Sequence, residues 1–176
     1  VSKLSVMTDY YYNYDQKVTM PLPQVYIYPS RYLDDYFSKL DEKVRKMLRG
    51  LNILNGTFFL QGFVNESGFF FFEPGYRPGG SSTCRYTKYL NNISYMDMLV
   101  NYSLTGSMGD DVNKENPYFS KKCCTLSLVV TGGEIGAIKG YDEIVKKPYI
   151  ISSEKRFDVG DVVKEKSALG QIVLRF

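Results

Sequence analysis

The sequence predicts an α+β protein with a mostly antiparallel sheet, two covering helices and a small β-rich tail. Short segments rich in β-branched and aromatic residues alternate with Gly and Pro, as expected for strands joined by turns. Two other segments place apolar residues three and four positions apart, which is the spacing of amphipathic helices. The last third of the chain holds only short apolar segments between glycines. We therefore predict a lobe over residues 1–116 and an appendage over residues 117–176.

Length and charge exclude several classes of protein. A chain of 176 residues can form one domain, or a core with a small appendage. The net charge of +3 is too small to indicate binding to nucleic acid or to an anionic membrane. No uninterrupted apolar segment is long enough to span a bilayer. We expect neither nucleic acid nor membrane as a partner. The start at Val1, without methionine, suggests a piece of a longer polypeptide.

The cysteines indicate a reducing compartment, so we expect a cytoplasmic protein. Cys84, Cys123 and Cys124 are odd in number, and adjacent cysteines rarely form a structural disulfide. The sequence contains no histidine. Without companion ligands for the two adjacent cysteines, zinc binding and His-based acid–base chemistry are excluded within this chain.

The first third of the chain predicts two strands and a helix. Residues 3–12 and 24–28 mix apolar, β-branched and aromatic types, and the second segment stops at Pro29. From Leu33 to Leu51, apolar residues line one helical face, with acidic residues early and basic residues late. This pattern is typical of an amphipathic helix that covers a sheet.

A hairpin is predicted next, with strands at 57–65 and 69–75 joined by Glu66-Ser67-Gly68. If Asn65 pairs with Phe69, Gln61 lies directly opposite Glu73, with Cβ atoms about 5 Å apart. The four phenylalanines at 69–72 occupy both faces of the second strand. We therefore expect the hairpin to be central and covered on both sides.

The remaining segments predict one more helix and the β-rich tail. Apolar spacing indicates a helix at about 94–105, which ends at Gly106. Residues 106–120 are polar and are expected to be mobile. Short strands are predicted at 126–130, 135–139, 149–153 and 169–176.

The predicted hairpin places three chemically useful side chains close together. Gln61 and Glu73 offer oxygen ligands of the kind that Mg²⁺ prefers. Arg77 lies near the open end of the same face, where a guanidinium can bind a phosphoryl oxygen. The alternative is an ion pair between Glu73 and Arg77, with Gln61 bonded to a backbone group. Geometry alone leaves both interpretations open.

The hairpin sequence resembles a known family. The run Gln61-x11-Glu73-Pro74-Gly75-Tyr76-Arg77, preceded by Asn55-Gly56 and followed by Gly79-Gly80, is similar to the C-terminal lobe of ATP-grasp enzymes. That superfamily includes biotin carboxylase, the D-alanine ligases and the large subunit of carbamoyl-phosphate synthase, and Gln61 looks most like the last. The resemblance covers most of the chain. It implies the C-terminal half of an ATP-grasp fold, followed by the small β-rich tail.

The resemblance also implies an activity and its cofactors. Gln61 and Glu73 would be ligands of the Mg²⁺ ions that bridge the ATP phosphates, and Arg77 would be the catalytic residue at the transferring phosphoryl group. Enzymes of this kind activate a carboxylate as an acyl phosphate, which an amine or a similar nucleophile then attacks. The implied partners are small-molecule carboxylate and amine substrates, the N-terminal lobes of the same polypeptide and, in a homodimer, a second copy. Without those lobes, we expect this chain to be inactive.

One departure from the family pattern leaves a second interpretation open. The family has an asparagine where this chain has Gly75, so one metal-binding oxygen is missing. The chain is then either part of a divergent ligase or a degenerate, non-catalytic binding module. Base stacking on the aromatic strands would need alternating rings flanked by Arg or Lys, whereas here Glu73 follows four successive rings.

Overall fold

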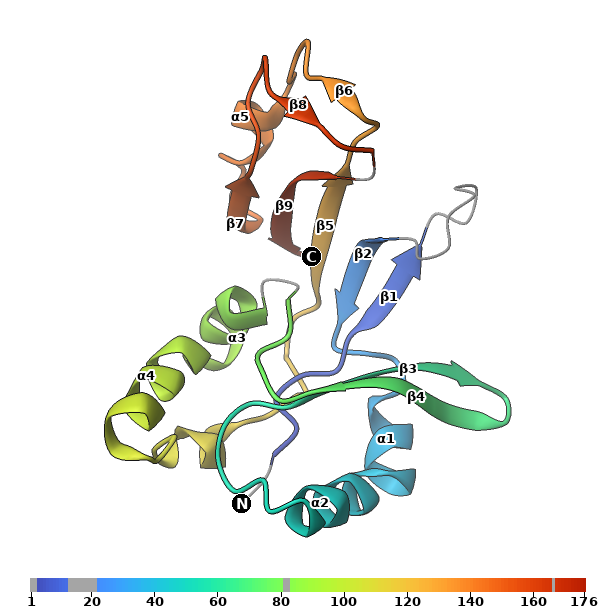
Figure 1. Ribbon diagram of the computed structural model, residues 1–176, viewed down its shortest axis with the longest axis vertical. Helices are drawn as coiled ribbons and strands as arrows, with labels where there is room; N and C mark the ends of the chain where they lie inside the picture. The colour runs from blue at the N-terminus through green and yellow to red at the C-terminus, as the bar shows by residue number, and fades with distance from the viewer. Residues whose placement is uncertain (1–2, 13–21, 81–82, 166) are drawn as a thin grey trace.

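A five-stranded antiparallel sheet forms the centre of the computed structural model, which describes residues 3–12, 22–80, 83–165 and 167–176. The strand order is β1-β2-β5-β9-β7 (Figure 1). The strands are β1 (Asp9–Tyr12), β2 (Pro23–Tyr28), β5 (Cys123–Val129), β7 (Ile150–Lys155) and β9 (Ala168–Arg175). This sheet and the surrounding helices confirm the predicted α+β class and match part of an ATP-grasp fold.

The central sheet joins strands from both sides of residue 117. β2 pairs with β5, so that Tyr28 lies opposite Cys123. The ring of Tyr28 also stacks on Tyr86, with centroids 3.8 Å apart. Both tyrosines are buried in one hydrophobic cluster with Cys123 and Val173. The division into 1–116 and 117–176 stays a prediction, and one core contains residues from both parts.

Strands β3 (Phe59–Asn65) and β4 (Gly68–Gly75) form a separate two-stranded hairpin. The predicted pairing of Asn65 with Phe69 is wrong, because Asn65 lies opposite Gly68 and the loop has only Glu66 and Ser67. The register then shifts between Gln61 and Gly62, which leaves Phe72 as an extra residue of β4. This β-bulge restores the predicted pair of Gln61 with Glu73.

The hairpin is not covered on both faces, as the phenylalanine run had suggested. Phe63 is 67% exposed, and Phe70, Phe71 and Phe72 are exposed as well. Figure 1 shows the hairpin outside the central sheet, with its turn projecting past α1. Much of the phenylalanine surface of the hairpin therefore faces solvent.

In the described part of the chain, four helices of at least seven residues accompany the strands. The predicted helix at 33–51 is two helices, α1 (Leu33–Lys39) and α2 (Asp41–Gly50), because the backbone of Leu40 leaves helical geometry at φ −129°. α3 (Thr83–Asn91) was not predicted and packs against β7. α4 (Tyr95–Thr105) confirms the prediction, with a Ser94 cap and Gly106 in the left-handed region.

Residues 106–120 pack into the molecule instead of forming a mobile loop. They contain a short 3-10 helix, η1 (Asp110–Lys114). Met108, Glu115 and Phe119 are buried, and Met108 joins a cluster with Ile93, Tyr95 and Met98 of the α4 region. The polar composition of this segment gave no sign that these three side chains are buried.

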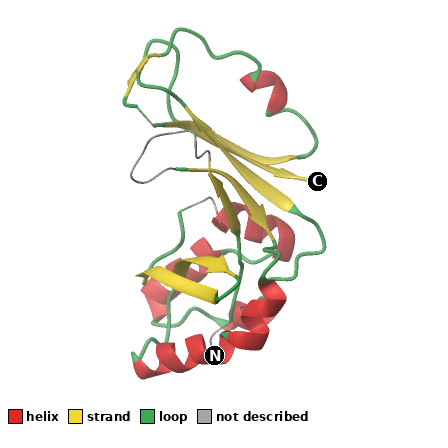
Figure 2. Cartoon of the chain, turned by 90° about the vertical axis from the view of Figure 1, so that its right-hand side faces the viewer, coloured by secondary structure: helices red, strands yellow, loops and turns green. Residues whose placement is uncertain are grey.

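The ends of the chain hold less regular structure than predicted. Residues 3–8 are not in a strand, and the expected strand at 135–139 is replaced by β6 (Gly133–Glu134). β6 pairs with β8 (Val162–Val163), and α5 (Tyr141–Ile144) lies between them in sequence. Figure 2 shows this tail at one end of the central sheet and the β3–β4 hairpin near the other. Within the described residues, no helix is long and apolar enough to cross a membrane.

Candidate functional site

Gln61 and Glu73 are direct neighbours across the hairpin, as the sequence predicted. Both side chains are half-buried and line one cavity of about 930 Å³. The Gln61 amide makes no hydrogen bond within the described part of the chain. This pair therefore presents an uncharged amide oxygen and a carboxylate group to a space that a ligand can enter.

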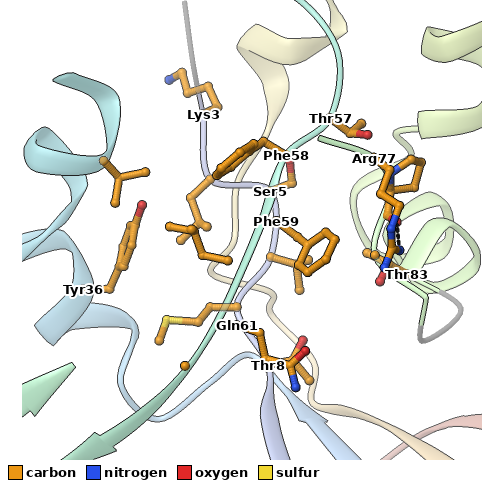
Figure 3. Close-up of a pocket in the computed structure, with 18 of the residues that line it drawn as sticks. Lys3, Ser5, Thr8, Tyr36, Thr57, Phe58, Phe59, Gln61, Arg77 and Thr83 are labelled. Carbon is orange, nitrogen blue, oxygen red and sulfur yellow. Dashed lines mark hydrogen bonds between the residues drawn. The ribbon is translucent and has the colours of Figure 1, made fainter. Parts of the chain in front are cut away.

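The cavity lies between the hairpin, the N-terminal segment and the helices. Figure 3 shows Phe59 and Gln61 of β3 and Thr8 of the N-terminal segment, with Tyr36 and Arg77 on opposite sides of β3 in this view. Thr83, at the start of α3, also lines the cavity. One space thus contacts side chains from all parts of the predicted lobe.

Arg77 lies on the same cavity and is held by three contacts. Its Nη2 is 3.9 Å from Oε1 of Glu73, and its guanidinium lies over the Phe59 ring, 4.6 Å from the centroid. Its Nη1 also donates to the carbonyl oxygen of Pro78 at 3.1 Å. The side chains of Arg77 and Glu73 are 60% and 46% exposed, so this long ion pair contributes little to stability. Both groups therefore remain accessible to a ligand.

Position 75 has no room for a side chain. Gly75 lies opposite Phe59 in the hairpin. A Cβ atom on Gly75 would meet three atoms of the Phe59 ring, with Cδ1 at 2.9 Å and two others closer. The space that an asparagine would need is thus filled by the aromatic ring on which Arg77 rests.

The donor set fits a metal ion that arrives with its own anionic ligand. Among the residues that the structure describes, no three Cys, Asp or Glu side chains come together as a metal site. Gln61 and Glu73 supply two hard oxygens, which is too few for a cation by itself. Mg²⁺ commonly takes one or two protein carboxylates and completes its shell with phosphate oxygens and water. The pair therefore fits Mg²⁺ bound to a nucleotide.

The sequence did not indicate a second group of polar residues on the cavity wall. Glu115 is only 7% exposed, and its Oε2 accepts a hydrogen bond from the Tyr95 hydroxyl at 3.2 Å. Burial raises the pKa of Glu115, although hydrogen bonds from Ser5 and Tyr95 partly oppose the rise. An isolated acidic residue in a polar segment gives no signal of this placement.

Arg31 is another cavity residue that the sequence did not single out. Its Nε is 3.7 Å from Oδ2 of Asp9, and its guanidinium lies 4.9 Å from the centroid of the Tyr32 ring. Asp9 in turn accepts hydrogen bonds from the Ser30 hydroxyl and from the backbone N–H of Arg31. The only sequence signal near this group is Pro29, which ends β2.

Solved structures with a similar fold are ligases, synthetases and carboxylases. An L-amino acid ligase from Bacillus licheniformis matches 91% of this chain with a TM-score of 0.75 at 17% identity. A phosphoribosylglycinamide synthetase from Anaerococcus prevotii matches 96% with a TM-score of 0.71 at 16% identity. The biotin carboxylase domain of the Hydrogenobacter thermophilus 2-oxoglutarate carboxylase, in complex with MgADP and bicarbonate, matches 86% with a TM-score of 0.61 at 12% identity.

This chain spans only part of the proteins that it resembles. It covers 40% of the L-amino acid ligase, 42% of the synthetase and 34% of the biotin carboxylase domain. No family model and no curated protein matches the sequence. These structures are ATP-grasp enzymes, so the chain has the fold of part of an ATP-grasp enzyme. The closer resemblance to carbamoyl-phosphate synthase stays a prediction.

Proposed function

We propose that this chain is part of an ATP-dependent ligase that activates a carboxylate as an acyl phosphate for attack by an amine or a similar nucleophile. The observation that supports the proposal is the cross-strand pair of Gln61 and Glu73 beside Arg77, on one accessible cavity. The similar folds of a ligase and a synthetase agree with this reaction class. A divergent relative of the carbamoyl-phosphate synthase large subunit is the closest description of the proposed parent protein.

The three side chains have different proposed roles. Gln61 and Glu73 would hold Mg²⁺ through their oxygens, and the ion would supply positive charge beside the phosphates of ATP. Arg77 binds the transferring phosphoryl group through its fork of N–H donors. Phe59 and Pro78 orient Arg77 from the face and from one end of the guanidinium. The protein contributes positioning and charge stabilisation to the reaction.

The proposal requires partners from outside this chain. The chain spans about two fifths of the first two matching structures, so we propose that N-terminal lobes of the same polypeptide complete the ATP site. We also propose a homodimer as the assembly of the complete protein. Three free thiols support our proposal of a cytoplasmic location. We expect the isolated chain to bind weakly and to catalyse no reaction.

An acyl-phosphate trap tests the proposed reaction in the complete polypeptide. Incubation with Mg·ATP, hydroxylamine and a panel of carboxylic acids should yield a hydroxamate with one acid, and ADP in equal amount. The Glu73→Gln and Arg77→Gln variants should lose this product by at least tenfold, because each loses a charged contact to the reacting groups. Hydroxamate formation that is the same in all three proteins would contradict the proposed roles.

Gly75 favours one alternative, a non-catalytic module that keeps the fold. Glycine has no side chain to supply the third metal ligand of the family pattern, and the Phe59 ring occupies the space that one would need. In that case Mg·ATP binding should be present without ADP release for any acid. The same assay therefore separates the two functions.

A further inference from the structure

We propose that Arg31 binds a second carboxylate of the substrate, remote from the carboxylate that reacts at the hairpin. This assignment to a substrate rests on the proposed function, whereas the anion site itself can be tested separately. Arg31 lines the same cavity as Gln61, Glu73 and Arg77, and its side chain is 66% exposed. The substrate class would then be an elongated dicarboxylate or an acid with a similar second anionic group.

Two contacts within the chain orient the guanidinium of Arg31. Asp9 contacts its Nε, and the Tyr32 ring lies beneath its plane. Asp9 is itself fixed by the Ser30 hydroxyl and the Arg31 backbone N–H, and its side chain is nearly buried. These contacts use Nε and one face of the guanidinium. The two Nη groups of Arg31 make no hydrogen bond to the described residues, so they can donate to a ligand. A carboxylate accepts two parallel hydrogen bonds from such a fork.

The other arginines of the cavity are already committed. Arg45 donates from Nε to Oδ2 of Asp41 at 2.7 Å, and both side chains are largely buried. Arg77 contacts Glu73 and has a proposed role at the phosphoryl group. Arg31 is therefore the guanidinium in this cavity that remains available for a different anion.

The length of β3 between the Tyr32 contact and Gln61 guides the choice of probe. The Tyr32 ring contacts the Phe69 ring edge-on, with centroids 6.4 Å apart. Phe69 pairs with Val64, which is three residues from Gln61 along β3. At about 3.3 Å per residue, Val64 and Gln61 are about 10 Å apart along the strand. We use this spacing to choose the length of the dicarboxylate probe.

The test is an NMR titration of the chain with suberate, which has a carboxylate at each end of an eight-carbon chain, and with octanoate, which has one. Suberate should bind more tightly than octanoate and should shift the Nε–H signal of Arg31. The Arg31→Gln variant should bind suberate about tenfold more weakly. Arg31→Lys keeps the charge without the fork and should lose most of the same affinity.

Arg49→Gln is the matched control, because Arg49 is similarly exposed, pairs with Glu42 at 2.7 Å and lies outside the cavity. It should leave suberate binding unchanged. Equal suberate affinity in the Arg31→Gln and Arg49→Gln variants would overturn the inference. Binding of inorganic phosphate, but not of suberate, through Arg31 would overturn the carboxylate assignment.

The outcome is distinguishable from a failure of the proposed function. If the chain binds Mg·ATP through Glu73 while the affinity for suberate is unchanged in Arg31→Gln, only this inference fails. If suberate binding depends on Arg31 while the complete polypeptide neither binds Mg·ATP nor forms a hydroxamate, the ligase proposal fails and the anion site stands.

Discussion

The ring of Phe59 covers Gly75 across the hairpin, and the guanidinium of Arg77 rests on the same ring. An aromatic ring over a glycine of the neighbouring strand stabilises a hairpin at a position that lacks a side chain. A side chain at position 75 would therefore disturb the ring on which Arg77 rests.

This relationship predicts that Gly75→Asn destabilises the chain. The new Cβ would displace the Phe59 ring, and such overpacking costs about 1–3 kcal/mol. Urea unfolding of Gly75→Asn, Phe59→Ala and the double variant measures the coupling between the two positions. The double variant should be more stable than the sum of the single effects predicts. Additive effects would contradict the contact.

Gln61→Glu should lower the stability of the metal-free chain and raise its affinity for metal. Two carboxylates directly opposite each other repel, which costs roughly 0.2–1 kcal/mol without metal. Added Mg·ATP should recover this loss and stabilise the variant more than the unaltered chain. Thermal unfolding with and without Mg·ATP measures both effects. Asn65→Asp adds a charge to the same strand outside the cavity, and it should show no such gain.

Glu115 predicts a pH dependence of stability. Burial raises its pKa in the folded protein above the ordinary value, so the folded state binds more protons between the two pKa values. Its contribution to stability is therefore complete below the ordinary pKa and is lost as the pH rises through the folded one. Glu115→Gln removes this titration and should flatten the profile above about pH 4.5. Urea midpoints across pH 4–8 measure the difference, and identical slopes would contradict it.

The three cysteines should differ in reactivity. Cys123 and Cys124 are buried, and burial raises the pKa of Cys123 to about 11, with Cys124 as the second cause. Cys84 is partly exposed and lines the cavity. Brief iodoacetamide treatment at neutral pH, followed by mass spectrometry, should modify Cys84 first, because thiolates react and thiols do not. Equal modification of Cys123 would show that the core opens readily.

The sequence predicted the key pair of residues through two deviations that compensate each other. The actual loop is one residue shorter than expected at Glu66-Ser67, and the bulge at Phe72 adds one residue back. Beyond the bulge, Gln61 therefore lies opposite Glu73 in both registers. The turn signal at Glu66-Ser67-Gly68 located the hairpin but gave a loop one residue too long, and the bulge depends on packing that local sequence does not specify.

The features that the sequence did not predict depend on tertiary contacts. α3 has Tyr86 and Thr87 buried in its middle, but its many polar residues conceal an amphipathic pattern. Glu115 and Arg31 lie on the cavity only because distant segments meet there. By contrast, α4 was predicted well, since Ser94 and Gly106 mark its ends by local chemistry alone.

Paramagnetic NMR with Mn²⁺·ATP tests the central claim most directly, because Mn²⁺ takes the same oxygen ligands as Mg²⁺ and broadens nearby signals. The account predicts selective broadening of the Gln61 side-chain amide and of the backbone amides around Glu73, with loss of the effect in Glu73→Gln. Broadening at other acidic residues such as Asp34 and Asp35, or at Gln61 in the Glu73→Gln variant to the same extent, would contradict it.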